Sequence, residues 1–152
     1  MDIDEKYMQD ALREARAALE EGEVPIGAVV VCRGAIIGKG HNMTERLHDP
    51  TAHAEMIAIT AATEAMGGKY LSDCTLYVTV EPCPMCAGAV INAGLKRLVY
   101  GAFDEKGGAC SSRINLFECG FSHTPLVRSR VLERECSDIL THFFRTLRSS
   151  PP

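Results

Sequence analysis

Four side chains in two short segments could together perform metal chemistry. The sequence Thr-Ala-His-Ala-Glu contains His53 and Glu55, and the sequence Glu-Pro-Cys-Pro-Met-Cys contains Cys83 and Cys86. One imidazole and two thiolates are ligands that suit zinc, and three protein ligands leave the fourth position of a tetrahedral ion open. An open position is typical of a catalytic zinc site, where a bound water loses a proton near neutral pH and becomes a nucleophile.

The spacing of the two cysteines predicts that they share one side of a helix. Cys83 and Cys86 are three residues apart, so their sulfur atoms lie on one face of a first helical turn. Pro84 suits the first position of a helix. A helix that begins there directs its positive N-terminal end toward the sulfur atoms, which favours thiolates over thiols.

The spacing of His53 and Glu55 gives these two residues different roles. Because they are two residues apart, they would project from nearly opposite faces of a helix, and they can converge only if the metal lies beyond the helix start. Thr51 is a suitable cap for such a start. Glu55 is therefore predicted to carry protons beside the metal rather than to bind it, since a positioned carboxylate acts as general acid and base.

Two simpler explanations of these motifs fit less well. A Cys-x-x-Cys motif can be a redox centre or half of a structural zinc site. A structural site needs four ligands, however, and the sequence has no second Cys-x-x-Cys or His-x-His pair to complete one. A redox motif leaves His-x-Glu unexplained, although His-x-Glu alone arises often by chance. The combination of a ligand set, an open position and a general base favours catalysis.

The paired motifs form the signature of the zinc nucleobase deaminases, and the resemblance extends further. The segments His48–Glu55, Leu76–Ala89 and Tyr100–Ala109 are similar to those of the bacterial tRNA-specific adenosine deaminases, a family of the cytidine/deoxycytidylate deaminase superfamily. The similarity runs from about Tyr7 to Arg148. It implies a three-layer α/β/α cytidine-deaminase-like fold with a mixed sheet of about five strands. The implied reaction is hydrolytic deamination of adenosine to inosine at the wobble position of a tRNA anticodon.

The resemblance also assigns roles that residue types alone do not reveal. It implies that His53, Cys83 and Cys86 bind one zinc ion per subunit and that Glu55 is the catalytic proton carrier. It places a tRNA anticodon stem-loop against six substrate-binding residues, which are Asn42, Ala54, Asp104, Lys106, Phe144 and Arg145. It further implies a homodimer with the substrate site near the subunit boundary, and neither a nucleotide cofactor nor a membrane is expected.

Elementary chemistry agrees with several of these assignments. The side-chain amide of Asn42 offers a donor and an acceptor to a purine edge, although such a residue is also ordinary in a loop. A carboxylate such as Asp104 can accept a hydrogen bond from a ribose 2′-hydroxyl, which separates RNA from DNA. The adjacent Phe143 and Phe144 cannot share one helix face, so one of them should be less buried and could stack on a base beside Arg145.

The elements that must position these residues follow from the periodicity of the apolar side chains. We expect helices over residues 4–20, 52–66, 84–93 and 133–148, and strands over residues 24–32, 35–40, 74–80, 95–100 and 126–131. The strand at 24–32 should be buried on both faces because it is an almost continuous run of apolar residues. The strand, helix and strand from 74 to 100 should form a parallel pair joined by a right-handed crossover.

Three further local features are expected. Asp4 is the predicted cap of the first helix. Gly38 and Gly40 lie within a strand, which indicates that another element approaches its backbone closely. Residues 101–124 are rich in Gly and Ser and show little periodicity, so they are predicted to form a functional or mobile loop. On the last helix, most apolar side chains are expected to belong to the core.

Composition favours one domain in a reducing compartment. The 152 residues fit a single domain over 1–152, of which 46% are hydrophobic, and no apolar run is long enough to span a membrane. Seven cysteines at irregular spacing argue against a disulfide framework and favour the cytoplasm. Cys32, Cys74 and Cys136 should be buried, whereas Cys110 and Cys119 fall in the predicted loop and receive no role.

The net charge of −4 is unusual for a protein that binds nucleic acid. Residues 1–23 contain eight acidic and three basic residues, a net of −5, which leaves twelve acidic and thirteen basic residues in the remainder. The acidic charge is thus concentrated in one N-terminal helix. Because the sequence has no basic run, any RNA footprint should be local and dependent on shape.

Three other functions share some of these motifs. A deaminase of a free nucleobase or nucleoside, of the guanine or cytosine type, has the same metal site and fold, so the site motifs alone do not select the substrate. Residues 101–124 and the last helix resemble the tRNA enzymes and so favour RNA. A noncatalytic RNA-binding zinc protein would not need Glu55. A riboflavin-pathway deaminase usually carries a fused reductase domain, for which 152 residues leave no room.

Overall fold

The computed structural model describes residues 1–149 and contains one mixed sheet of five strands. The strands are β1 (Gly27–Cys32), β2 (Ala35–His41), β3 (Cys74–Val80), β4 (Arg97–Ala102) and β5 (Leu126–Arg128), in the spatial order β2-β1-β3-β4-β5. β1 pairs antiparallel with β2 and β3, whereas β3, β4 and β5 run parallel. The predicted mixed sheet and the predicted parallel pair around the cysteine helix are therefore confirmed.

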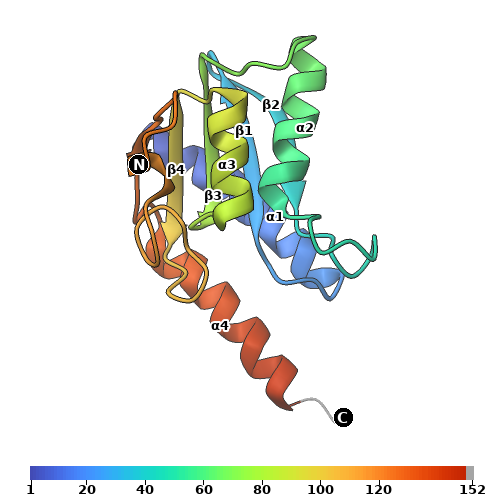
Figure 1. Ribbon diagram of the computed structural model, residues 1–152. Helices are drawn as coiled ribbons and strands as arrows, with labels where there is room; N and C mark the ends of the chain where they lie inside the picture. The colour runs from blue at the N-terminus through green and yellow to red at the C-terminus, as the bar shows by residue number, and fades with distance from the viewer. Residues whose placement is uncertain (150–152) are drawn as a thin grey trace.

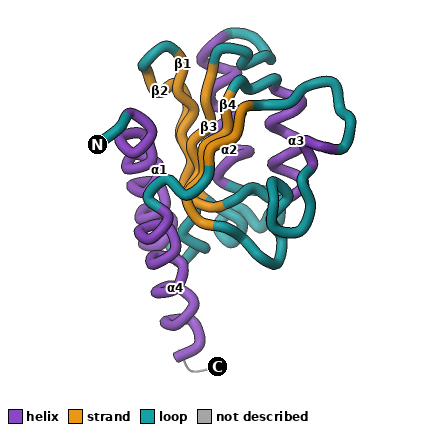
Figure 2. The backbone as a smooth tube through the Cα atoms, turned by 90° about the vertical axis from the view of Figure 1, so that its left-hand side faces the viewer, coloured by secondary structure: helices purple, strands orange, loops and turns teal. Residues whose placement is uncertain are grey.

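Four helices cover the two faces of this sheet (Figures 1 and 2). α1 (Ile3–Glu20) and α4 (Glu133–Ser149) lie on one face, and α2 (Ala54–Met66) and α3 (Pro84–Ala93) lie on the other. α1 contacts β1, β3 and α4, while α2 contacts β1, β2 and α3. The structure is thus the three-layer α/β/α arrangement expected from the sequence. The predicted domain of residues 1–152 extends three residues beyond the described part.

Each face of the sheet has its own apolar core. Leu76 and Val78 of β3 point into the core beneath α2 and α3, whereas Tyr77 between them points into the core beneath α1 and α4, as the twofold alternation of a strand requires. Because helices cover both faces, every residue of β1 is buried, which confirms that prediction. Cys32, Cys74 and Cys136 are buried as well.

α2 packs unusually close to β2. A Cβ atom on Gly38 would overlap the carbonyl oxygen of Ala58, and one on Gly40 would overlap that of Ala54. Only glycine therefore lets the helix approach the strand this closely. The close approach predicted from the two glycines is confirmed, and it places the start of α2 beside the end of β2.

The structure corrects the predicted start of the first helix. Asp2, not Asp4, is the N-cap of α1, because its carboxylate accepts the N–H of Glu5 at 2.9 Å while the Glu5 carboxylate accepts the N–H of Asp2. This capping box satisfies two backbone donors at once. Asp4 instead lies in the first turn and is buried.

The segment 101–124 is more ordered than its composition suggests. It contains an isolated β-bridge between Cys110 and Asn115 and a 3-10 turn over Leu116–Glu118. Its order comes from hydrogen bonds to residues distant in the chain, which periodicity does not reveal. The predicted loop is therefore present over most of the segment, with these two short elements in addition. Cys110 is buried in the segment and Cys119 is exposed.

α4 is less buried than predicted. Cys136 is its only buried residue within the described part, whereas Phe144 is 40% exposed and Leu147 is 59% exposed. The second half of the helix projects beyond the end of the sheet (Figure 1), and Phe144 and Leu147 on this half remain exposed. The expectation that this side belongs mostly to the core was wrong. Among residues 1–149, no helix combines the length and the apolar character required to cross a bilayer.

Candidate active site

The starts of α2 and α3 bring one imidazole and two thiol groups together. The Nδ1 atom of His53 lies 3.6 Å from Sγ of Cys83 and 3.6 Å from Sγ of Cys86, and the three atoms all lie within 4.8 Å of one another. Tetrahedral geometry with zinc–ligand bonds of the usual length gives an N···S distance of ~3.6 Å. The three residues predicted as metal ligands are therefore spaced to hold one tetrahedral ion.

Local backbone geometry produces this arrangement. His53 and Cys83 are the N-cap residues of α2 and α3, both with extended backbone, and Pro84 occupies the first position of α3 as predicted. Thr51 does not cap α2, since its N–H and its hydroxyl donate to Asp49. His53 lies just outside the helix and makes no side-chain cap bond, so its imidazole is available to face the two sulfur atoms.

Asn42 supplies the cap that His53 does not. Its Oδ1 atom accepts the backbone N–H of Ala54, the first residue of α2, at 2.8 Å. Among residues 1–149, the NH₂ group of Asn42 donates to no other group, so a donor remains for a ligand. The N–H of Ala54 is engaged by Asn42, and the side chain of Ala54 is fully buried. The predicted contact between Ala54 and the substrate stays a prediction.

Glu55 is a buried carboxyl group beside the three metal-binding candidates. Its residue is only 4% exposed, and it interacts with the side chain of Cys86. Burial raises the pKa of Glu55 to about 7. A carboxyl group with such a pKa can hold or release a proton near neutral pH, which is what a general acid and base requires.

The charges of the three candidate ligands are interdependent. Hydrogen bonding from Cys86 and then from His53 lowers the pKa of Cys83 to about 4, despite the opposing effect of burial. The Cys83 thiolate raises the pKa of Cys86 and that of His53. The backbone of Pro50 also raises the pKa of His53. A bound cation would take the place of the protons shared among these groups.

A groove of about 650 Å³ lies between α4 and the segment that follows β4. Asp104, Lys106 and Phe144, three of the predicted substrate contacts, line it together although they come from different parts of the chain. The other lining residues are Val24, Ile26, Val80, Phe103, Glu105, Leu140, Thr141 and Arg148. Val80 is three residues before Cys83, and the carbonyl of Ile26 accepts the N–H of Asn42, so the groove adjoins the residues around the metal candidates.

The residues predicted to contact the substrate differ in exposure and in hydrogen bonding. Phe144 is exposed and Phe143 is half-buried, which confirms that the two aromatic residues differ in burial. Arg145 is exposed but does not line the groove. One carboxylate oxygen of Asp104 accepts the N–H groups of Lys106 and Gly107, both at 3.2 Å. Asp104 therefore closes a tight turn within its own segment.

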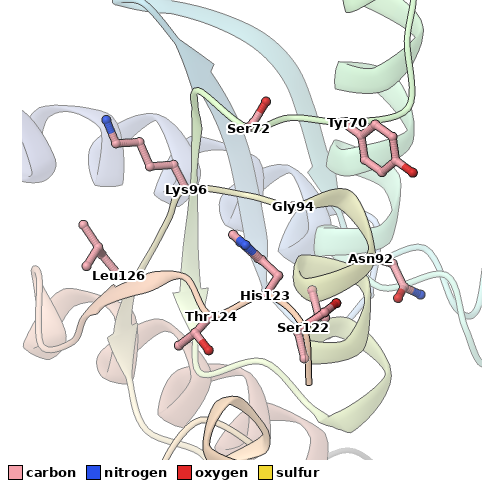
Figure 3. Close-up of a pocket in the computed structure, with 10 residues that line it drawn as sticks. Tyr70, Ser72, Asn92, Gly94, Lys96, Ser122, His123, Thr124 and Leu126 are labelled. Atoms are coloured by element: carbon pink, nitrogen blue, oxygen red, sulfur yellow. The ribbon is translucent and has the colours of Figure 1, made fainter. Parts of the chain in front are cut away.

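A pocket of about 710 Å³ lies at the opposite end of the strands (Figure 3). It is bordered by Gly94, which follows α3, and by His123, whose Nε2 atom donates to the carbonyl of Leu95 at 2.6 Å. None of the predicted site residues lines this pocket. The end of α3 that faces it is the one remote from the two cysteines, so we do not assign the chemistry to this pocket.

Known proteins resemble this chain over nearly its whole length. A family model described as MafB19-like deaminase matches residues 2–148. The tRNA-specific adenosine deaminase of Bacillus subtilis (strain 168) is 51% identical over 149 residues, which cover 97% of this chain and 92% of that protein.

Two solved structures also match. One, from work on A-to-I editing by tRNA:A34 deaminases at the wobble position of transfer RNA, has a TM-score of 0.86 and 48% identity, and covers 89% of this chain and 99% of its own. Another, a guanine deaminase from Nitrosomonas europaea, has a TM-score of 0.81 and 26% identity over 91% of this chain and 83% of its own. The two solved structures share this fold although their descriptions name different substrates, a tRNA adenosine and guanine.

Proposed function

The chain belongs to the MafB19-like deaminases and to the family of tRNA-specific adenosine deaminases, and from this membership we propose that it converts adenosine to inosine at the wobble position of a tRNA anticodon. One observation of the structure carries the proposal. His53, Cys83 and Cys86 converge on one point, and the buried Glu55 lies beside them. A metal site with an adjacent proton carrier is what hydrolytic deamination requires.

We propose that the ion at this point is zinc, one per subunit, held by His53, Cys83 and Cys86. The mixed nitrogen and sulfur donors and their spacing support zinc. When bound there, zinc supplies a water molecule that ionises near neutral pH at the open fourth position.

Glu55 then performs the proton transfers. Its carboxylate accepts one proton from the water that adds to C6 of adenine and delivers it to the neighbouring ring nitrogen, and it then passes the second proton of that water, from the new C6 hydroxyl, to the amino group. The C6–N bond breaks as the C6–O bond becomes a carbonyl, and ammonia leaves. The pKa of about 7 that burial gives Glu55 supports this role, because one group must both take up and release the proton.

The residues around the groove are proposed to bind the anticodon stem-loop. The free NH₂ group of Asn42 would donate to the target base next to the metal. The exposed ring of Phe144 would stack on a neighbouring base, and Lys106 and Arg145 would contact phosphates. The groove carries acidic as well as basic side chains, so binding would depend on shape more than on charge.

Assembly and location complete the proposal. We propose that residues 1–152 form a single domain that acts as a homodimer, without a nucleotide cofactor. None of the seven cysteines forms a disulfide bond among residues 1–149, which supports the reducing cytoplasm expected from the sequence.

A deaminase of a free purine is the second candidate, since the guanine deaminase from Nitrosomonas europaea has a similar fold. The two candidates predict different substrates for the same metal site. The purified protein would be incubated with an anticodon stem-loop that carries adenosine at the wobble position, and inosine would be measured by nuclease digestion and chromatography. Free guanine, cytosine, adenosine and cytidine would be assayed in parallel for ammonia.

Inosine from the stem-loop alone is the expected result. Ammonia from a free base, together with an unchanged stem-loop, would support the second candidate instead and would remove the proposed RNA contacts. Deamination of neither class of substrate by zinc-loaded protein would contradict both.

A further inference from the structure

Glu81 is a buried carboxylate that the catalytic proposal does not use. It follows the last residue of β3, it is 3% exposed, and it lies two residues before Cys83. Its Oε1 atom accepts the N–H of Asp104 at 3.1 Å and also the hydroxyl of Ser112. Its Oε2 atom accepts three successive backbone N–H groups, those of Cys110 at 3.1 Å, Ser111 at 2.9 Å and Ser112 at 2.9 Å.

All five donors come from one segment, residues 104–112, which we call the anchored loop. The loop fits closely around the carboxylate, because a Cβ atom on Gly108 would overlap the side chain of Glu81. Two backbone bonds complete the arrangement. The N–H of Ala109 donates to the carbonyl of Pro82 at 2.9 Å, and the N–H of Gly108 donates to the carbonyl of Asp104 at 2.8 Å.

The position of Glu81 joins two parts of the proposed site. On one side it precedes Pro82 and Cys83, where α3 begins. On the other side it holds the loop whose residues Asp104 and Lys106 form part of the groove wall. The carboxylate therefore fixes the groove wall relative to the residues that would hold the metal.

We propose that Glu81 is a positioning residue for substrate binding, which holds the anchored loop in the conformation that receives the anticodon stem-loop. The proposal rests on the proposed function for the identity of the substrate. A carboxylate is needed because all five partners are donors. A glutamine would place an NH₂ group against backbone N–H groups, and at least one of these donors would lose its acceptor.

The first test measures the loop without reference to activity. In the full-length protein, Glu81→Gln should raise hydrogen exchange by roughly ten- to a hundredfold, either at the amide of Asp104 or at the amides of residues 110–112, according to the side that the new NH₂ group faces. This change corresponds to loss of a hydrogen bond to a charged acceptor. Glu23→Gln is the matched control. Glu23 is fully buried and accepts the N–H groups of Glu45 and Arg46, so this variant should open those amides and leave residues 110–112 unchanged.

The second test separates positioning from general stability. With wobble-adenosine stem-loop as substrate and metal content matched, Glu81→Gln should raise KM by about tenfold or more while kcat stays within about threefold. A lower kcat with unchanged KM, matched by a lower fraction of folded protein, would show a structural role only and overturn the proposal. Unchanged exchange at Asp104 and at residues 110–112 alike would overturn it as well.

A milder variant covers the case in which Glu81→Gln does not fold. Ser112→Ala removes one of the five donors, namely its hydroxyl, and keeps the carboxylate. It should raise KM and exchange in the same direction by smaller factors, and no change in either would contradict the proposal. If the wild-type protein does not deaminate the stem-loop, the proposed function fails, and the exchange experiments alone then decide whether Glu81 holds the loop.

Discussion

The side-chain oxygen of Asn42 accepts the backbone N–H of Ala54 at 2.8 Å, so the residue that directly follows β2 caps the helix that begins directly after His53. The N-cap residue His53 makes no side-chain bond to its own helix, which leaves its imidazole free to face Cys83 and Cys86. The cap and the metal-binding candidate are thus supplied by two different segments of the chain.

Mutation can separate the capping role of the Asn42 oxygen from the proposed base-binding role of its NH₂ group. Asn42→Asp keeps the oxygen that caps α2 and removes the NH₂ donor, so it should retain the melting temperature and lose at least about tenfold in kcat/KM for the stem-loop. Asn42→Ala removes both groups and should also destabilise the protein by about 1 kcal/mol. Thermal unfolding and steady-state kinetics measure the two effects. Full activity of Asn42→Asp would exclude the NH₂ group from base recognition.

Glu55 should be required for turnover and not for folding or metal binding. Glu55→Gln and Glu55→Ala should lower kcat by about 10²–10⁴-fold, the usual contribution of a general acid and base. Glu64→Gln is the matched control on the same helix, because Glu64 is exposed. Metal content by mass spectrometry and the circular dichroism spectrum should match the wild type in all three variants. Appreciable turnover by Glu55→Ala would remove Glu55 from the mechanism.

Removal of the metal should abolish activity reversibly. Dialysis against a strong chelator should eliminate deamination, and one equivalent of zinc per chain should restore it, since the three donors are spaced for one ion. Cys83→Ser should bind zinc more weakly. Cys119→Ser, at an exposed cysteine outside the site, should retain both zinc and activity. The idea fails if the chelated protein, shown to be free of metal, deaminates at the wild-type rate.

Asp4 should make the stability of the protein depend on pH in the acid range. Hydrogen bonds from Arg97, and further ones from Tyr77 and Arg128, hold the pKa of Asp4 well below its usual range although burial opposes this. A lowered pKa in the folded state gives stability that is complete above the unfolded-state pKa of about 4 and is lost as the pH falls below it.

Replacement of the Asp4 carboxylate tests the direction in which stability changes with pH. Asp4→Asn should lower the free energy of unfolding by about 1.5–3 kcal/mol near pH 7, and the difference from the wild type should shrink steadily below about pH 4. Urea unfolding at several pH values measures it. A difference that grows as the pH falls would contradict this assignment.

The exposed ring of Phe144 should contribute to RNA binding through stacking. Phe144→Leu keeps an apolar side chain on α4 but removes the aromatic ring, so KM for the stem-loop should rise by about five- to a hundredfold, as expected from base–aromatic stacking. Phe143→Leu is the control, because Phe143 borders a different cavity together with Leu19. Equal changes in the two variants would indicate an effect on α4 as a whole rather than a stacking contact.

Local patterns in the sequence were sufficient to predict the elements that hold the candidate metal ligands. The spacing of Cys83 and Cys86 and the proline between them placed both sulfur atoms at a helix start, and the structure has α3 beginning at Pro84. The apolar run around β1 predicted a strand buried on both faces. These features depend on residues a few positions apart, and the geometry of helices and strands is fixed over such distances.

Tertiary structure decided which distant segments hold one another. Glu81 binds donors 23 to 31 residues later in the chain, and no periodicity marks such a partnership. Asn42 caps a helix that starts twelve residues later, and Asp4 of α1 forms an ion pair with Arg128 of β5. Likewise, the apolar side of α4 has the pattern of a core helix but projects past the sheet. Hydrogen bonds and burial between segments depend on where the folded chain passes, and short-range sequence patterns do not contain that information.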